Sequence, residues 1–383
     1  MKKKIAIIGS TGSIGVSTAS IIKKNIKNFN VCLLSTNKNI SILKNQIKIF
    51  KPRYIVINDY KQYLKFIKSN KNKKIKIFNN FKFIRKKSIT KLDYTISAIS
   101  GFEGLEPTLE IIPFTKIIAI ANKESLICGW NLIEKKLKRF KTTFIPVDSE
   151  HFSIWSLVKN TNEDVKKIYI TASGGPFLKK SIKQLANVKP KEAMKHPTWN
   201  MGKKISVDSA TMMNKGLEVI EAKVLFNLDL DNIIAIIHRQ SKVHALVEFF
   251  DGTVIAHMSN PDMKIPISFA LTYPERIYEH SNSQHDYADL SFEKLSLEQF
   301  PCYRLSRNVA KLGKNSGLIL NAANEISVEY FLKKKIIYTD IPRIIEDTLD
   351  SSEIISHDDI NCILENDLEI RKKTREIIKI KYL

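Results

Sequence analysis

The sequence has few of the features that mark an exported or membrane protein. Its four cysteines are scattered along the 383 residues, at Cys32, Cys128, Cys302 and Cys362. None of them forms a CxxC pair, which argues against a disulfide framework or a zinc knuckle and favours a reducing compartment. Glycines interrupt the apolar run in the opening MKKKIAIIGSTGSIG, and no later apolar run is long enough to cross a bilayer. We therefore expect a cytoplasmic protein without a signal peptide or a membrane span.

Acidic residues are also few in comparison with basic ones. The chain has 62 Lys+Arg against 39 Asp+Glu, a formal net charge of +23 at pH 7. Such an excess is typical of proteins that bind nucleic acid. Here, however, the lysines are spread among isoleucine and asparagine, most densely in residues 68–79, and no helix-turn-helix, RRM or zinc-finger pattern accompanies them. We interpret the excess as a compositional bias and expect no nucleic-acid partner, although a basic nucleic-acid-binding protein stays the alternative of a different class.

The first 150 residues contain a regular alternation of apolar runs and helix-compatible sequence. Short strand-like runs occupy residues 4–9, 29–34, 53–58, 93–99 and 116–122. Strands that alternate with helices form a parallel sheet covered on both faces, so that each strand is almost continuously apolar. This pattern predicts an α/β fold that begins with a Rossmann-type, doubly wound parallel sheet.

The pattern changes after residue 150. Strand-like runs at 167–177, 233–239, 242–250 and 252–258 predict a second sheet, and the sequence beyond residue 300 has helical periodicity. With 43% hydrophobic residues, the chain can form two or three cores. The expected organisation is a dinucleotide-binding domain (1–150), a central α/β catalytic domain (151–275) with a flexible lid around 195–203, a connecting segment (276–299) and a C-terminal helical domain (300–383).

A glycine-rich turn follows the first expected strand. Residues 9–15 read GSTGSIG, with glycines spaced three apart, and a helix is expected from Ser13. Glycine lets a backbone approach a pyrophosphate closely, and a helix amino terminus offers unpaired N–H groups and a partial positive charge. No GK[ST] follows, so the turn is not a P-loop. The context of strand, turn and helix predicts a dinucleotide site.

The residues after the second expected strand indicate which dinucleotide is bound. An NAD enzyme usually has an acidic residue there, to bind the ribose 2′-hydroxyl. This chain has LSTNKN at residues 34–39, in which Lys38 would attract a 2′-phosphate. The sequence therefore favours NADP over NAD.

Two carboxylates lie two residues apart where another strand-like run ends. These are Asp148 and Glu150, at the sheet edge where ligands gather in this architecture. Glu218 is the candidate for a third carboxylate. Three carboxylates form a hard, all-oxygen site that suits Mg²⁺ or Mn²⁺. In isolation, the pair at 148 and 150 is better explained by a turn with solvated carboxylates, and the neighbouring motifs favour the metal site.

Donors suited to a phosphate monoester gather in the middle of the sequence. Ser173 begins a glycine-rich turn, and Ser209, Asn214 and Lys215 fall close together. A segment from His196 to Gly202, which includes Trp199 and Met201, has the composition of a lid that closes over a substrate. The remaining histidines on strand-like runs, His238, His244 and His257, are expected to be structural.

Taken together, these motifs resemble those of one family, 1-deoxy-D-xylulose-5-phosphate reductoisomerase. The resemblance runs along essentially the whole chain, through GSTGSIG (9–15), ANKESL (121–126), PVDSEH (146–151), ASGGPF (172–177), HPTWNMGKKISVDSATMMNKGLE (196–218), NPDMKIPI (260–267) and LNAANEISVEYFL (320–332). It implies a V-shaped, homodimeric subunit that reduces a sugar phosphate with NADPH. The implied reaction breaks and re-forms a carbon–carbon bond of 1-deoxy-D-xylulose 5-phosphate and yields 2-C-methyl-D-erythritol 4-phosphate, in non-mevalonate isoprenoid precursor biosynthesis.

The resemblance also implies roles for individual residues. Metal binding is implied for Asp148, Glu150 and Glu218, which with Lys123 are the expected catalytic residues. Substrate binding is implied for Lys123, Ser149, Glu150, Ser173, His196, Ser209, Asn214, Lys215 and Glu218. Cofactor contacts are implied for Thr11, Gly12, Ser13, Ile14, Asn37, Lys38, Asn39, Asn122, Glu124 and Gly202, and Trp199 and Met201 are placed on the lid.

The chain departs from the family pattern at several positions. Asn37 stands where glycine is common, and Arg239 and Lys242 add two cations to a segment that usually reads HPQS followed by valine or isoleucine. Another NADP-dependent oxidoreductase, such as a semialdehyde dehydrogenase, is the alternative within enzymes. That chemistry needs a nucleophilic cysteine, and Cys128 has no evident histidine partner in the sequence.

Overall fold

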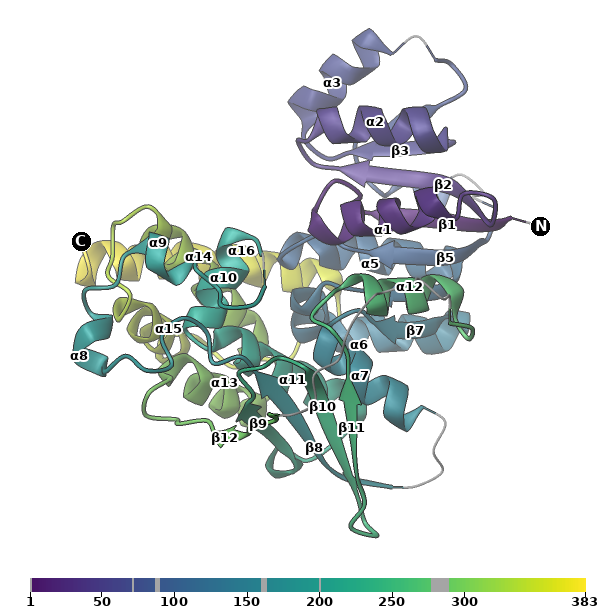
Figure 1. Ribbon diagram of the computed structural model, residues 1–383. Coiled ribbons are helices and arrows are strands. Elements are labelled where there is room, and N and C mark those ends of the chain that lie inside the picture. The colour runs from purple at the N-terminus through teal and green to yellow at the C-terminus, as the bar shows by residue number, and fades with distance from the viewer. Residues whose placement is uncertain (1, 71, 87–89, 160–163, 200, 277–288) are drawn as a thin grey trace. The chain divides into compact units, whose positions relative to one another are not determined.

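The computed structural model describes residues 2–70, 72–86, 90–159, 164–199, 201–276 and 289–383. The chain forms two compact units (Figure 1). The first comprises Met1–Leu126, Trp130–Asp148 and Asp262–His280, and the second comprises Ile127–Gly129, Ser149–Pro261 and Ser281–Leu383. The expected α/β fold, with a Rossmann-type sheet and a helical C-terminal part, is confirmed.

The first unit is built on a parallel sheet. Among the described residues its strands follow the order β4-β3-β2-β1-β5-β6-β7. They are β1 (Lys3–Ile8), β2 (Phe29–Thr36), β3 (Tyr54–Ile57), β4 (Lys76–Phe78), β5 (Leu92–Ser97), β6 (Thr115–Ile120) and β7 (Thr143–Pro146). The chain adds β2, β3 and β4 on one side of β1 and then β5, β6 and β7 on the other side. In parallel sheets, ligands bind at the carboxyl ends of the strands where the order of addition changes in this way, here between β1 and β5.

Helices connect these parallel strands. They are α1 (Ser13–Lys24), α2 (Ile40–Phe50), α3 (Tyr60–Ser69), α4 (Phe83–Lys86), α5 (Leu105–Ile111) and α6 (Lys123–Phe140), with α12 (Lys264–Thr272) added from later in the sequence. α12 packs on α1 (Figure 1), and the Tyr94 hydroxyl donates to the Tyr273 carbonyl at 2.9 Å. Burial of Ile5, Ile7 and Ile8 on both faces of β1 explains why the parallel strands are continuously apolar.

The second unit contains a mixed sheet. In the part of the chain that the structure describes, its order is β11-β10-β8-β9-β12, with β8 and β9 parallel and the other pairs antiparallel. The strands are β8 (Val165–Ala172), β9 (Ile233–Ile237), β10 (Val243–Phe249), β11 (Val254–Met258) and β12 (Glu293–Lys294). Helices α7 (Ser149–Val158) and α11 (Met213–Phe226) pack on this sheet.

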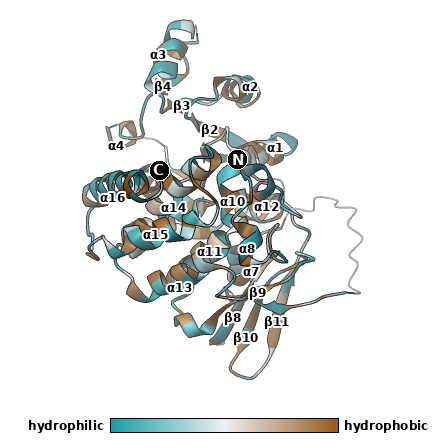
Figure 2. Cartoon of the chain, turned by 90° about the vertical axis from the view of Figure 1, so that its left-hand side faces the viewer, coloured by the Kyte–Doolittle hydropathy of each residue, from teal (hydrophilic) through white to brown (hydrophobic). Residues whose placement is uncertain are grey.

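Short helices and a C-terminal helical layer complete the second unit. They are α8 (Ile182–Leu185), α9 (Pro190–Ala193), α10 (Lys203–Ala210), α13 (Pro301–Leu312), α14 (Ser316–Leu332), α15 (Asp340–Asp350) and α16 (Ile360–Lys381). Helices α13, α15 and α16 carry hydrophilic and hydrophobic residues side by side (Figure 2). α11 approaches α13 closely at Gly216, where an added Cβ would lie 2.2 Å from the Ser306 Oγ. The C-terminal helices therefore hold α11, which carries several predicted site residues.

Most strand-like runs were predicted within two or three residues of their actual bounds, but some elements were not predicted. β4 lies in the lysine- and asparagine-rich stretch, where the local composition favours a loop, and α12 follows a proline-containing segment. Within the predicted connecting segment 276–299, residues 277–288 lie outside the described part of the chain, and β12 pairs with β9. The two compact units each combine several segments of the chain and do not correspond to the predicted domains. The domain boundaries at residues 150, 275 and 299 therefore stay predictions.

Candidate active site

The glycine-rich turn joins β1 to α1. Gly9 has a φ of +79°, and a Cβ there would lie 2.6 Å from the Ala98 carbonyl oxygen at the end of β5. A Cβ on Gly15 would lie 2.2 Å from the Gly9 oxygen. Gly12 is the N-cap of α1 and offers no side-chain hydrogen bond, so the first N–H groups of this helix are directed to a ligand or solvent. The backbone geometry fits a bound pyrophosphate.

Polar contacts that the sequence did not predict hold this turn in place. The Ser35 Oγ accepts from the Gly9 N–H at 2.7 Å, and the Ser10 Oγ donates to the Gln46 Oε1 at 2.7 Å. Gln46 in turn donates to the Ser10 carbonyl at 2.6 Å, and Thr11 and Thr36 share a hydrogen bond between hydroxyls at 2.7 Å. β2 and α2 therefore fix the conformation of the turn. No sequence signal identifies Ser35 and Gln46, because polar residues of this type are common in both elements.

The residues expected to distinguish NADP from NAD lie directly after β2. Asn37, Lys38 and Asn39 are all exposed. Asn39 is the N-cap of α2, and its Oδ1 accepts from the Ile42 N–H at 3.2 Å. This leaves Lys38 as the cation on the loop, with its ammonium accessible to an anionic ligand.

Lys123 and Asp148 come together at the carboxyl ends of neighbouring strands. Lys123 begins α6 after β6, and Asp148 follows β7. Their side chains form an ion pair, with 3.1 Å between Nζ and Oδ2. The preceding Asn122 is buried, accepts from the Ser125 N–H at 2.5 Å and donates to the Gly101 carbonyl at 2.7 Å. Glu124, which follows Lys123, is partly buried.

Three carboxylates converge as the sequence predicted. Asp148, Glu150 and Glu218 each offer one oxygen, and these oxygens all lie within 4.8 Å of one another. Glu150 lies in the first turn of α7, and Glu218 lies on α11, where it is 1% exposed. Such an all-oxygen donor set fits Mg²⁺ or Mn²⁺. The close approach of three carboxylates is itself unfavourable unless cations compensate it.

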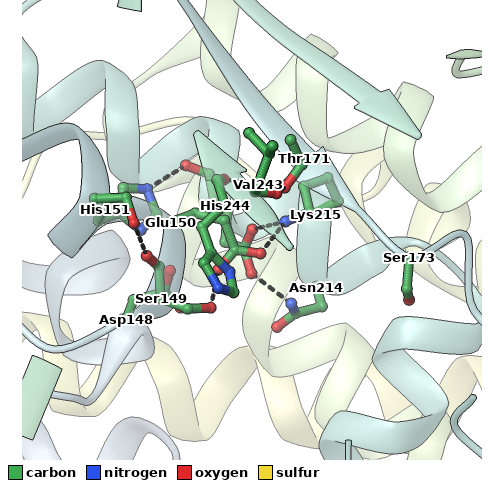
Figure 3. A network of polar contacts seen from close by, with 12 residues as sticks. Asp148, Ser149, Glu150, His151, Thr171, Ser173, Asn214, Lys215, Val243 and His244 are labelled. Atoms are coloured by element: carbon green, nitrogen blue, oxygen red, sulfur yellow. Dashed lines mark hydrogen bonds and ion pairs between the residues drawn. The ribbon is translucent and has the colours of Figure 1, made fainter. Parts of the chain in front are cut away.

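Lys215 supplies part of that compensation (Figure 3). Its Nζ donates to the Glu150 Oε1 at 2.6 Å and also to the Glu218 Oε2. Burial by itself would lower the pKa of Lys215, but the charges of Glu150 and Glu218 outweigh that effect and raise it. Asn214 adds a neutral donor, with its Nδ2 2.5 Å from the Glu218 Oε1. Lys215 therefore stays charged, and Asn214 and Lys215 form one polar network with Glu150 and Glu218.

Two further side chains support the carboxylates. Ser149 donates to the Glu150 Oε2, and the buried His151 Nε2 lies 2.9 Å from the Glu218 carbonyl oxygen. The other ring nitrogen of His151 lies 3.5 Å from the Glu221 Oε1. His151 thereby links α7 to α11. His151 belongs to the PVDSEH motif, but the sequence pattern did not identify it as a site residue.

Ser173 and His196 form a second polar pair. The His196 Nδ1 accepts from the backbone N–H groups of Thr198 at 3.1 Å and Trp199 at 2.8 Å, so its proton must lie on Nε2. Nε2 then donates to the Ser173 Oγ at 3.0 Å, which also accepts from the Gly175 N–H at 3.3 Å. Burial lowers the pKa of His196 to about 4, so the ring is neutral at pH 7. The Ser173 hydroxyl hydrogen can therefore point to an anionic ligand.

Ser209 lies on α10, near the turn that carries Ser173. A Cβ on Gly175, whose φ is +64°, would lie 2.7 Å from the Ser209 carbonyl oxygen. α10 is joined to α11 through Met212, which has a φ of +58°. This reversal brings Ser209 and Lys215, which belong to successive helices, to the same region of the second unit.

The expected lid precedes α10. The half-buried Trp199 ring lies 6.4 Å from the His244 ring, measured between centroids. Met201 is partly buried and Gly202, the N-cap of α10, is exposed, whereas residue 200 lies outside the described part of the chain.

The three histidines that were expected to be structural each have a partner in the protein. His238 Nδ1 lies 2.9 Å from the Ser291 carbonyl oxygen, and His244 Nε2 lies 3.1 Å from the Ser259 carbonyl oxygen. His257 Nδ1 lies 2.8 Å from the Ser153 Oγ.

The Rossmann-type sheet and its glycine turn define a protein of the dinucleotide-binding class, and the carboxylate cluster adds a site that fits a divalent metal. None of the described helices is long and apolar enough to cross a membrane. Three family models match the chain: 1-deoxy-D-xylulose 5-phosphate reductoisomerase over residues 5–129, its C-terminal domain over 144–226, and the DXP reductoisomerase C-terminal domain over 258–373. The chain belongs to the 1-deoxy-D-xylulose 5-phosphate reductoisomerase family.

Individual relatives support this conclusion. The reductoisomerase of Pelagibacter ubique is 47% identical over 344 residues, which cover 88% of this chain and 89% of that protein. The one from Caldanaerobacter subterraneus is 41% identical and covers both chains completely. A crystal structure of the reductoisomerase with NADPH, fosmidomycin and magnesium has a TM-score of 0.92 and 38% identity, and covers 99% of this chain and 98% of that chain. The Zymomonas mobilis enzyme with NADPH has a TM-score of 0.91 and 35% identity, with both chains fully covered.

Proposed function

We propose that this protein converts 1-deoxy-D-xylulose 5-phosphate to 2-C-methyl-D-erythritol 4-phosphate, with NADPH as reductant and Mg²⁺ or Mn²⁺ as the metal. The observation that carries the proposal is the cluster of Asp148, Glu150 and Glu218, whose carboxylate oxygens lie within 4.8 Å of one another. Family membership along the whole chain and the NADPH and magnesium bound by the related structure support the same activity. The product would enter isoprenoid precursor biosynthesis.

The glycine turn would bind NADPH. The N–H groups of Ser13 and Ile14 at the start of α1 would contact the pyrophosphate, beside Thr11 and Gly12 of the preceding turn. Lys38, between Asn37 and Asn39, would bind the 2′-phosphate. Asn122, Glu124 and Gly202 are proposed as further cofactor contacts. When bound, NADPH would supply a hydride to the aldehyde that the rearrangement produces. Asn37 introduces a side chain into this loop, which an exposed position accommodates.

The three carboxylates would hold the divalent metal. The metal would act as a Lewis acid on the substrate oxygens, and this stabilises negative charge that develops on them during the rearrangement. Lys215 holds Glu150 and Glu218 in their ligand orientation, and Lys123 does the same for Asp148. Lys123 also places positive charge beside the reacting oxygens.

The phosphate group of the substrate would bind to Ser173, Ser209, Asn214 and Lys215. Because His196 is neutral and donates through Nε2, it sets the orientation of the Ser173 hydroxyl without adding charge. Binding energy from the unreactive phosphate would order the lid that includes Trp199 and Met201, and the closed lid would exclude water from the reaction. Ser149, which donates to Glu150, would complete the contacts to the sugar hydroxyls.

We also propose that the enzyme is a cytoplasmic homodimer with no nucleic-acid partner, organised as the domains 1–150, 151–275 and 300–383 joined by the segment 276–299. The support for these proposals is the resemblance of the motifs, together with the dispersed distribution of lysine. Sedimentation of the purified chain tests the dimer.

The test of the activity is oxidation of NADPH, followed by absorbance, in the presence of 1-deoxy-D-xylulose 5-phosphate. We expect oxidation that requires Mg²⁺ or Mn²⁺, stops when the metal is removed by a chelator, and resumes when the metal is restored. Identification of the branched alcohol by mass spectrometry establishes the rearrangement. If a folded protein that binds NADPH produced no oxidation with either metal, the proposed substrate would be wrong.

A further inference from the structure

Helix α10 carries one of the proposed phosphate ligands at a strained position in the chain. Ser209 is the second-to-last residue of α10, and only two residues separate this helix from α11. One of the two is Met212, which is 2% exposed and has a φ of +58°. A left-handed conformation is costly for a side chain of this size, so contacts elsewhere must hold the junction.

Two buried side chains from the C-terminal helical layer contact this junction. The Asn324 Nδ2, on α14, donates to the Asp208 Oδ1 at 2.8 Å. The Tyr338 hydroxyl, in the segment before α15, donates to the Ala210 carbonyl oxygen at 2.7 Å. Asp208 and Ala210 immediately flank Ser209, so the two hydrogen bonds hold the backbone on either side of that residue.

The surroundings make both hydrogen bonds strong restraints. Asp208 is 1% exposed and Asn324 is 0% exposed, and removing one donor from a buried carboxylate costs free energy, because water cannot take its place. The second Asp208 oxygen lies 2.9 Å from the Lys204 Nζ, at the start of the same helix. Burial raises the pKa of Tyr338 well above its ordinary value, so its hydroxyl remains a neutral donor.

We propose that Asn324 and Tyr338 are positioning residues that hold Ser209 in place for the substrate phosphate. The inference rests on the proposed function, which makes Ser209 a phosphate ligand. Neither residue is proposed to touch the substrate, since both act through the flanking residues of α10. The C-terminal helices thereby determine the geometry of the phosphate site, and binding of the sugar phosphate depends on them more than binding of NADPH does.

The first test compares Tyr338→Phe and Asn324→Leu with the wild type in the full-length enzyme. We expect the KM for 1-deoxy-D-xylulose 5-phosphate to rise about tenfold, the loss expected from one or two misdirected hydrogen bonds. The KM for NADPH should change less than about twofold, because the nucleotide turn lies in the other compact unit and the proposed cofactor contact Gly202 caps the opposite end of α10 from Ser209. Ser327→Ala is the matched control, since its buried hydroxyl donates at 2.7 Å to the Ala323 carbonyl of its own helix.

A second test separates positioning from general stability. Asn324→Asp would place two carboxylates together, whereas the double variant Asp208→Asn, Asn324→Asp restores a donor and an acceptor with their places exchanged. We expect the single variant to lose phosphate affinity and the double variant to recover a large part of it. Tyr338→Phe removes only one hydroxyl group, so it still tests the proposal if Asn324→Asp does not fold.

Competition by inorganic phosphate gives a readout that does not need turnover of the sugar phosphate. Its dissociation constant, measured by calorimetry, should rise in Tyr338→Phe and Asn324→Leu but not in Ser327→Ala. Equal phosphate affinities in all four proteins, or KM values for both substrates that rise together in proportion to lost thermal stability, would overturn the positioning role. A different outcome would contradict the proposed function alone. In that case the wild type binds phosphate, Tyr338→Phe binds it more weakly, and the wild type does not oxidise NADPH.

Discussion

The nucleotide turn and the carboxylate cluster both serve charged ligands, but they are built by opposite means. The turn is one continuous segment, residues 9–15, that presents backbone N–H groups and has no charged side chain. The cluster brings together formal charges on Asp148, Glu150, Lys215 and Glu218 from separate elements. A backbone site tolerates changes of side chain but not the addition of a Cβ where space is lacking. A site of paired charges tolerates no loss of one charge, since its neighbours are then left uncompensated.

The largest expected effect is the loss of a charge from the cluster. In Glu218→Gln the shape is kept, but one ligand charge is removed and the partner of the buried Lys215 is weakened. We expect kcat to fall on the order of a thousandfold, because metal-assisted charge stabilisation is the main contribution to such chemistry. The measurement is the rate of NADPH oxidation at saturating metal.

The matched control is Glu293→Gln, an exposed carboxylate on β12, which should leave the rate unchanged. NADPH binding by Glu218→Gln, followed by fluorescence, should remain close to that of the wild type. A variant at Glu218 with nearly full activity would show that the three carboxylates do not act as the metal site.

The second-largest expected effect concerns the glycine turn, whose backbone N–H groups form the nucleotide site. A Cβ on Gly15 would lie 2.2 Å from the Gly9 oxygen, whereas a Cβ on Gly12 would lie 3.5 Å from its nearest neighbour. We therefore expect Gly15→Ala to weaken NADPH binding about a hundredfold by displacing the turn, and to lower thermal stability. Gly12→Ala should keep the stability of the free protein. Titration with NADPH and thermal melts of both variants check this, and equal melting temperatures for the two would refute the steric argument.

A smaller effect on NADPH binding is expected at Lys38, a single exposed cation that would contact the 2′-phosphate. Replacing Lys38 by glutamate would set a negative charge beside the 2′-phosphate, and we expect the KM for NADPH to rise about tenfold while that for NADH changes little. Lys44→Glu changes net charge equally on the adjacent helix, and it should have little effect. Steady-state kinetics with both nucleotides decide the matter. A parallel loss in the two lysine variants would mean that only overall charge attracts the cofactor.

The smallest effect concerns the pH dependence of stability at His196. Its pKa is lowered to about 4 in the folded protein, so between about pH 4 and pH 6.5 the unfolded chain binds the proton more strongly. The contribution of His196 is therefore complete above pH 6.5 and is lost as the pH falls toward 4. His196→Gln should reduce the drop in Tm over this range by on the order of 1–2 °C. Melting curves of the variant and wild type at several pH values provide the measurement, and identical slopes would show that the ring is not buried in its neutral form.

Much of the fold followed from local patterns. The parallel strands of the first unit could be predicted because each is an apolar run bounded by turn residues, and the glycine turn because its residues are contiguous. The metal and phosphate candidates were recognised because their chemical types are unusual together and because they match a family. β4 was not predicted, because its apolar residues Ile77 and Phe78 follow a lysine-rich stretch, and pairing with β3 is what makes them a strand.

The sequence by itself therefore determined the class of fold, the nucleotide turn and the residues available for chemistry, since these depend on the identity and spacing of neighbouring residues. Tertiary structure alone decided how those residues are held. The hydrogen bonds of Ser35 and Gln46 to the glycine turn, the pairing of Lys215 with Glu150, and the contacts of Asn324 and Tyr338 with α10 all join segments distant in the chain. A hydrogen bond requires two groups within about 3 Å, and for groups so far apart in sequence only the folded path of the backbone brings them to that distance.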